Sequence, residues 1–159
     1  MAGSRTRLDL LIDALAVVAA ALLCALVVLV LVDVAARYLR WFSLAWGLEA
    51  SEYALYAITF LGAPWVLRER GHIAIELVVE WLPARARAAA RRVADALGAL
   101  VCLLLLVFAC RVLWRSYAAG TMVHKSFVFP EWLVYAGLPP VFLILLAVYL
   151  RWLLGARAP

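Results

Sequence analysis

Four long apolar runs, separated by charged segments, dominate the pattern along the chain. Two of them carry no Asp, Glu, Lys or Arg over Ala14–Val32 and Trp132–Leu150, and two shorter uncharged runs cover Tyr53–Leu67 and Ala96–Cys110. A helix needs about 20 largely apolar residues to cross the roughly 30 Å hydrocarbon core of a bilayer. The pattern therefore predicts four transmembrane helices, at about 14–32, 48–67, 93–113 and 132–150.

A different period appears between the second and third runs. Three apolar residues recur there at every fourth position, and charged or titratable residues recur on an adjacent face. The apolar set is Ile73, Leu77 and Trp81, and the polar set is His72, Glu76 and Glu80. Such spacing is typical of an amphipathic helix that lies in the membrane interface. We predict this helix at about 73–82 on the cytoplasmic side, ended by Pro83, and we expect 84–92 to extend the third span into the cytoplasm.

Composition agrees with a membrane protein and excludes a soluble domain. The 159 residues are 69% hydrophobic with a mean hydropathy of +1.04, whereas soluble domains are about 45–50% apolar. The first run is longer than the 7–15 residues usual in a signal peptide, so we expect an uncleaved span. The sequence thus predicts an all-α integral membrane protein with a single domain over residues 1–159.

The three cysteines indicate neither disulfide chemistry nor metal binding. Cys24, Cys102 and Cys110 lie inside the predicted spans, and no two of them form a CxxC pair. We expect them to be buried as small apolar residues.

The net charge of +5 is informative through its distribution. Ten basic residues lie at the two ends of the chain and between spans two and three, and five lie in the other two connections. The positive-inside rule then places both termini and the middle connection of this multi-pass protein in the cytoplasm. A topology signal explains the basic middle connection better than nucleic-acid binding, although this connection could also contact anionic lipid headgroups.

Polar residues are scarce where a transport pathway would need them. Ionisable groups near the bilayer midplane are expensive and are kept for function, yet all ionisable residues lie near the predicted span ends. Thr59 is the most polar residue near a span centre, and its hydroxyl can bond to the carbonyl of the preceding turn. Pro139 and Pro140 are the only helix-disrupting pair. The chain alone therefore does not look like a conduit.

Enzymatic and haem-binding functions are not supported either. His72 and His124 are predicted on opposite sides of the membrane, so they could not hold one haem between the spans. Glu49 and Glu52 share a helix face, but they lie near the outer surface with no nucleophile or metal ligand close by in sequence. We expect them to pair with Arg37 or Arg40, or with a cation on a partner chain. No enzyme activity and no cofactor are predicted.

A series of short motifs, in a fixed order, resembles one protein family over nearly the whole length. The motifs are Arg37-Tyr38 closing span one, Trp46 and Glu49 opening span two, Phe60 to Ala63 within it, Arg68 and His72 after it, Leu82-Pro83 ending the amphipathic segment, and Pro130, Trp132, Tyr135 and Pro139 around span four. The chain resembles the small transmembrane subunit, of the DctQ type, of tripartite ATP-independent periplasmic (TRAP) transporters. It departs from the pattern at Leu48, often acidic in the family, and at Glu52, often basic, and the acidic residue usual shortly after the His-Ile pair appears here as Glu76.

The resemblance implies a scaffold subunit. In this family a large membrane subunit holds the substrate and sodium sites, a periplasmic binding protein delivers an organic acid by transient contact, and the small subunit anchors the large one in the bilayer. Gly62 would permit close helix packing. The candidates for partner contacts or structural roles are Arg37, Trp46, Glu49, Glu52, Gly62, Arg68, His72, Glu76, Leu77, Trp81 and Pro139. Two alternatives stay open: an independent small four-helix transporter or channel, and a membrane assembly protein unrelated to transport.

Overall fold

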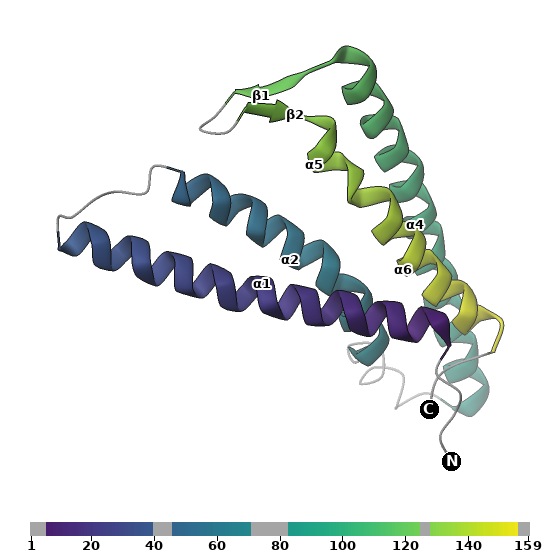
Figure 1. Ribbon diagram of the computed structural model, residues 1–159. Helices are drawn as coiled ribbons and strands as arrows, with labels where there is room; N and C mark the ends of the chain where they lie inside the picture. Colours follow the sequence, from purple (N-terminus) through teal and green to yellow (C-terminus); the bar gives the residue numbers. More distant parts are fainter. Residues whose placement is uncertain (1–5, 40–45, 71–82, 125–127, 156–159) are drawn as a thin grey trace.

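The computed structural model describes residues 6–39, 46–70, 83–124 and 128–155 and shows an all-α protein with one short β hairpin (Figure 1). In chain order the elements are α1 (Arg7–Tyr38), α2 (Gly47–Arg70), α4 (Ala84–Ala119), β1 (Met122–His124), β2 (Val128–Pro130), α5 (Trp132–Ala136) and α6 (Leu138–Leu153). The expected extension of the third span is confirmed, because α4 begins at Ala84. The expected amphipathic helix at 73–82 lies outside the described residues.

The helix ends follow from local sequence. Thr6 precedes α1, and its backbone N–H donates to the Asp9 carboxylate at 3.0 Å, as in a capping box. α4 ends at Gly120, whose backbone adopts a left-handed φ of 61°. Gly137 separates α5 from α6, and Pro139 lies in the first turn of α6, where its missing N–H costs little. The fourth predicted span is therefore two consecutive helices.

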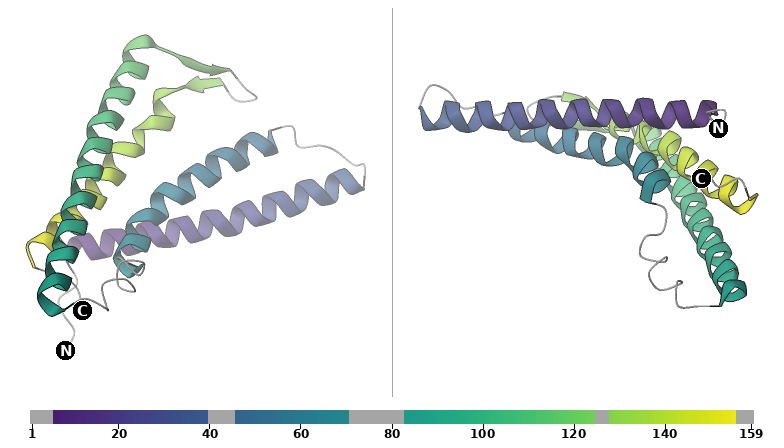
Figure 2. Two further views of the ribbon diagram at one scale, coloured as in Figure 1. Left: turned by 180° about the vertical axis from the view of Figure 1, so that it is seen from behind. Right: turned by 90° about the horizontal axis from the view of Figure 1, so that it is seen from below.

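The helices form an open row and not a closed bundle. α1 packs against α2, α4 packs against α6, and α2 contacts α6, so that the order across the row is α1, α2, α6, α4. Figures 1 and 2 show the two helical hairpins close together at the end that holds the described N- and C-terminal residues, and diverging toward the end with the β hairpin. In such a row every helix keeps an outward surface, and many large apolar side chains are exposed there.

Small residues allow the close contacts within each hairpin. On α4 the residues turned toward α6 are small or polar and follow the helical period, at intervals of three, four or seven positions. They are Asp95, Ala99, Cys102, Ala109 and Ser116, all buried. The backbone of Gly98 lies directly against the ring of Tyr149 on α6. This is the packing expected in lipid, where small residues let helix backbones approach one another. Cys102 is buried as expected, but the same expectation was wrong for Cys24 and Cys110, which are exposed on outward faces.

Three of the described helical segments are long and apolar enough to cross a membrane: Arg7–Tyr38, Ala86–Ala119 and Trp132–Leu153. The fourth candidate, α2, has 24 residues, which corresponds to about 36 Å of helix. Tyrosine, serine, threonine and proline interrupt its apolar residues, so that its sequence is less apolar than those of the other three. The structure thus supports three spans, and the fourth stays a prediction.

Candidate functional site

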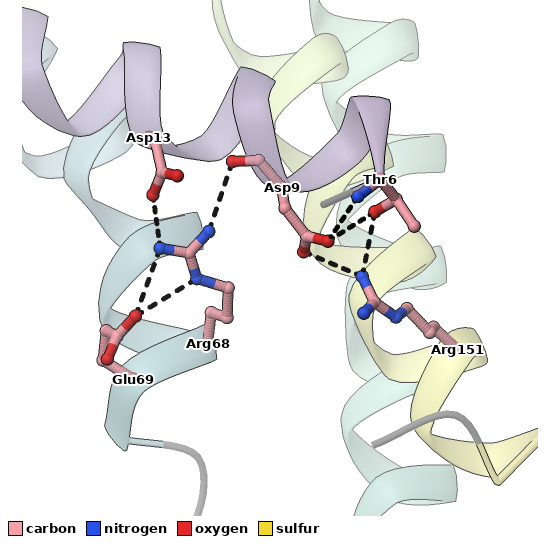
Figure 3. A network of polar contacts seen from close by, with 6 residues as sticks. All are labelled: Thr6, Asp9, Asp13, Arg68, Glu69 and Arg151. Atoms are coloured by element: carbon pink, nitrogen blue, oxygen red, sulfur yellow. Dashed lines mark hydrogen bonds and ion pairs between the residues drawn. The ribbon is translucent and has the colours of Figure 1, made fainter. Parts of the chain in front are cut away.

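The densest set of charged contacts joins three helices at one end of the row, and Figure 3 shows it from close by. We call Thr6, Asp9, Asp13, Arg68, Glu69 and Arg151 the inner polar cluster. Arg68, near the end of α2, forms an ion pair with Asp13 of α1 at 2.5 Å and donates to the backbone carbonyl of Asp9 at 3.2 Å. Its neighbour Glu69 accepts two further bonds, from Nε at 3.2 Å and from Nη2 at 3.1 Å. Arg68 thereby fixes the end of α2 against the beginning of α1.

Arg151 makes the corresponding connection from α6. Its Nη1 atom lies 2.8 Å from Oδ1 of Asp9 and donates to the Thr6 hydroxyl at 3.2 Å. The side chains of Arg151 and Asp9 are 26% and 15% exposed, so that water screens this pair less than a surface pair. Asp9 therefore connects the first helix of the chain to the last.

The pKa directions follow from these contacts. The hydrogen bond from Thr6 lowers the pKa of the Asp9 carboxyl, burial opposes this effect, and the hydrogen bond and charge of Arg151 add to the lowering. For Arg68, burial lowers the pKa, but the hydrogen bonds and charges of Asp13 and Glu69 outweigh it, and the net pKa is raised. Asp9 and Arg68 are thus both stabilised in their charged forms, which suits ion pairing.

A second polar group lies at the opposite end of the row, where α4, the β hairpin and α5 meet. The carboxylate of Glu131 accepts hydrogen bonds from the hydroxyls of Thr121 at 2.5 Å, Tyr135 at 3.1 Å and Ser116 at 3.3 Å. The bonds from Thr121 and Tyr135 are the main causes that lower the pKa of Glu131. This outer polar cluster fixes the hairpin, whose strands pair Met122 with Pro130 and Val123 with Phe129, to the end of α4.

An apolar cleft of about 460 Å³ separates the two helical hairpins in the same half of the molecule. Its walls come from α2, β2, α5 and α6, and they consist of Tyr53, Tyr56, Ala57, Phe60, Leu61, Phe129, Leu133, Val134, Gly137 and Val141. The Tyr56 hydroxyl donates to the Val134 carbonyl at 3.0 Å. No charged side chain lines the cleft, so it has no cation that would neutralise an organic anion.

The structure distributes the predicted site residues over both ends. Arg68 belongs to the inner polar cluster. Arg37 forms an ion pair with Asp33 of its own helix at 2.8 Å, and its expected pairing with Glu49 or Glu52 stays a prediction. Arg40, the other expected partner, lies outside the described residues.

The remaining candidates are partly accounted for. Gly62 faces α1, because a Cβ built on it would lie 4.0 Å from that of Ala19, and the Thr59 hydroxyl donates to the Leu55 carbonyl at 2.8 Å, as expected. Trp46 is exposed just before α2, and Pro139 lies in the first turn of α6. Four candidates lie outside the described residues: His72, Glu76, Leu77 and Trp81.

The sequence pattern alone does not reveal the partners of Arg68. It places Asp9, Asp13 and Glu131 only as charges near span ends, and Arg151 only as a basic residue near the carboxyl end. One local signal was available, because Thr6 and Asp9 have the spacing of a capping box. A further surprise is Asp95, which is 1% exposed on the α6 side of α4.

The comparison with protein families identifies the chain. The family described as "Tripartite ATP-independent periplasmic transporters, DctQ component" matches residues 26–157. The chain belongs to this family and is the small component of a TRAP transporter, as the motif order indicated. A search among curated proteins gave no match.

Proposed function

We propose that this chain is a static membrane scaffold that supports the large permease subunit of its TRAP transporter. In this proposal the complex takes up an organic acid by sodium coupling, after a periplasmic binding protein has delivered it. The chain crosses the inner membrane four times, with α2 as the fourth span. Both termini and the inner polar cluster face the cytoplasm, consistent with the basic residues at the beginning of α4.

The position of the charged contacts carries the proposal. The described ion pairs lie at helix ends, where Arg68 and Arg151 connect α1, α2 and α6, and Asp33 and Arg37 pair near the far end of α1. A substrate or sodium path would need polar groups near the bilayer midplane. The apolar cleft has no charged side chain in its wall, so we assign movement of the anion to the large subunit.

The open row of helices supports the same function. A closed four-helix bundle would expose each helix on one side only, whereas here α1 and α4 stand at the two edges of the row. Their outward surfaces are rich in exposed apolar side chains, among them Val17 and Leu31 on α1 and Val107 on α4. Inside a bilayer such surfaces pack against lipid or another membrane protein, and they provide the lateral area that a scaffold needs.

Reconstitution tests the proposal directly. Proteoliposomes should contain this chain alone, the large subunit alone, or both, each with the binding protein and an inward sodium gradient, and uptake of a radiolabelled organic acid should be measured. We expect uptake only with both membrane subunits and the binding protein present. Sodium-driven flux from the isolated chain would overturn the scaffold function and favour an independent small transporter. Full uptake by the large subunit without this chain would show that the scaffold is not required.

A further inference from the structure

Two arginines stand on the outward side of α4, at the end opposite to its basic beginning. Arg111 and Arg115 are both exposed, and they are four residues apart, which places their Cβ atoms about 5–6 Å apart on one side of the helix. The residues of α4 that face α6 at this level are Ala109 and Ser116, and both are buried. The two guanidinium groups therefore point away from the rest of the chain.

These two arginines lack a counter-charge within the described part of the chain. No hydrogen bond or ion pair of either residue is found among residues 6–39, 46–70, 83–124 and 128–155, whereas Arg37, predicted on the same side of the membrane, is neutralised by Asp33. The positive-inside rule makes cations rare on this side. Two neighbouring cations with no counter-charge among the described residues are therefore available to an anion from outside the chain.

An apolar stripe continues from the arginine pair toward the middle of the span. Phe108, Leu104 and Val101 follow at helical spacing and are 57%, 50% and 52% exposed. Beside the pair, Trp114 is 70% exposed, and tryptophan is enriched where hydrocarbon meets the headgroups. The face therefore has two cations at its outer end and apolar surface below them.

We propose that Arg111 and Arg115 bind the phosphate of an anionic phospholipid of the outer leaflet, such as phosphatidylglycerol, whose acyl chains lie along Val101, Leu104 and Phe108. Arginine binds phosphate through parallel charged hydrogen bonds. Its long side chain can reach the headgroup region from a backbone position deeper in the membrane. A carboxylate on a partner protein would instead require both guanidinium groups to lose their water inside an interface, which is unfavourable. The headgroup region stays hydrated and avoids that loss.

The expected selectivity can be bounded. Each basic residue near an anionic membrane surface contributes about 1 kcal/mol, which corresponds to roughly a fivefold change in local lipid concentration. Removing both charges should therefore lower the local enrichment of phosphatidylglycerol by between roughly fivefold and roughly 25-fold, the larger value if the two contributions add fully.

Trp114 provides the measurement. The full chain is placed in nanodiscs with a fixed ratio of phosphatidylglycerol to phosphatidylethanolamine, with brominated acyl chains on one lipid or on the other. The signal of Trp114 is obtained as the difference between the protein and its Trp114→Phe variant. We expect stronger quenching per brominated phosphatidylglycerol than per brominated phosphatidylethanolamine, and loss of this difference in the Arg111→Gln/Arg115→Gln variant. The matched control is Arg7→Gln/Arg92→Gln, which removes two exposed arginines at the other end and should keep the difference.

Circular dichroism of each variant verifies that the helices are intact. Equal quenching by the two lipids in the unaltered chain would overturn the proposal. So would a preference that survives in the Arg111→Gln/Arg115→Gln variant, or one that the control loses to the same extent. If the unaltered chain shows no lipid preference and the Arg111→Gln/Arg115→Gln variant no longer copurifies with the large subunit, the arginines meet a protein carboxylate and the lipid site is refuted.

Discussion

The contact between Gly98 and Tyr149 makes a sharp test of the packing between α4 and α6. A Cβ atom on Gly98 would lie 2.4 Å from both Cε1 and Cζ of the Tyr149 ring, closer than any relaxed carbon–carbon contact. Gly98→Ala therefore forces the ring, or the whole of α6, to move. Overpacking of this kind destabilises by about 1–3 kcal/mol, and the better helix propensity of alanine returns about 1 kcal/mol. The difference is about 0–2 kcal/mol, and we expect a net loss near the upper end because three ring carbons lie 2.4, 2.4 and 2.9 Å from the Cβ position.

Two variants make this result interpretable. Gly137 has φ −74°, and a Cβ atom on it would have no neighbour within 4 Å, so Gly137→Ala serves as a matched control that should be neutral or slightly stabilising. The Tyr149→Leu change removes the ring carbons that clash with the new methyl group. In that background, Gly98→Ala should therefore lower the free energy of unfolding much less than it does in the unaltered chain.

The free energy of unfolding is measured in mixed micelles by titration with a denaturing detergent, followed by circular dichroism and tryptophan fluorescence. If Gly98→Ala is as stable as the Gly137→Ala control, α4 and α6 do not pack through this glycine and the hairpin geometry described above is wrong. If the loss persists unchanged in the double variant, it arises from the backbone of α4 and not from the tyrosine ring.

Three further predictions concern the polar clusters and the topology. A double-mutant cycle of Arg68→Gln and Asp13→Asn should give a coupling free energy of about 1–3 kcal/mol, as for a hydrogen bond between charged groups, and additive losses would refute the pair. The pKa of Asp9 is lowered in the folded state, so its charged carboxylate stabilises the fold above the unfolded pKa of about 3.9. This stabilisation is lost as the pH falls further through the folded pKa. Asp9→Asn should therefore reduce the loss of folding free energy at acid pH, measured by the same detergent titration. Reporter fusions after Pro159 should give a cytoplasmic signal and fusions beside Lys125 a periplasmic one, and a periplasmic carboxyl end would overturn the proposed topology.

The sequence predicted the helices well, because uncharged runs of membrane length leave few other structures. It predicted three of the spans and the beginning of α4, and the motif order identified the family. It could not show that α2 lies between α1 and α6, since helix order in a membrane depends on side-chain shapes that periodicity does not encode. The partners of Arg68 were missed for a related reason. Asp13 is 55 residues away along the chain, and charges near span ends look alike until the helices are placed.

The contact between Asp9 and Arg151 has a consequence for biogenesis. These residues are 142 positions apart, so the ion pair can form only after nearly the whole chain has left the ribosome and the last helix has entered the bilayer. Until then the first helix is held by α2, through the packing of the two helices and the ion pair of Arg68 with Asp13. The contact between the first and last helices thus forms only at the end of insertion, and a chain interrupted before α6 lacks it.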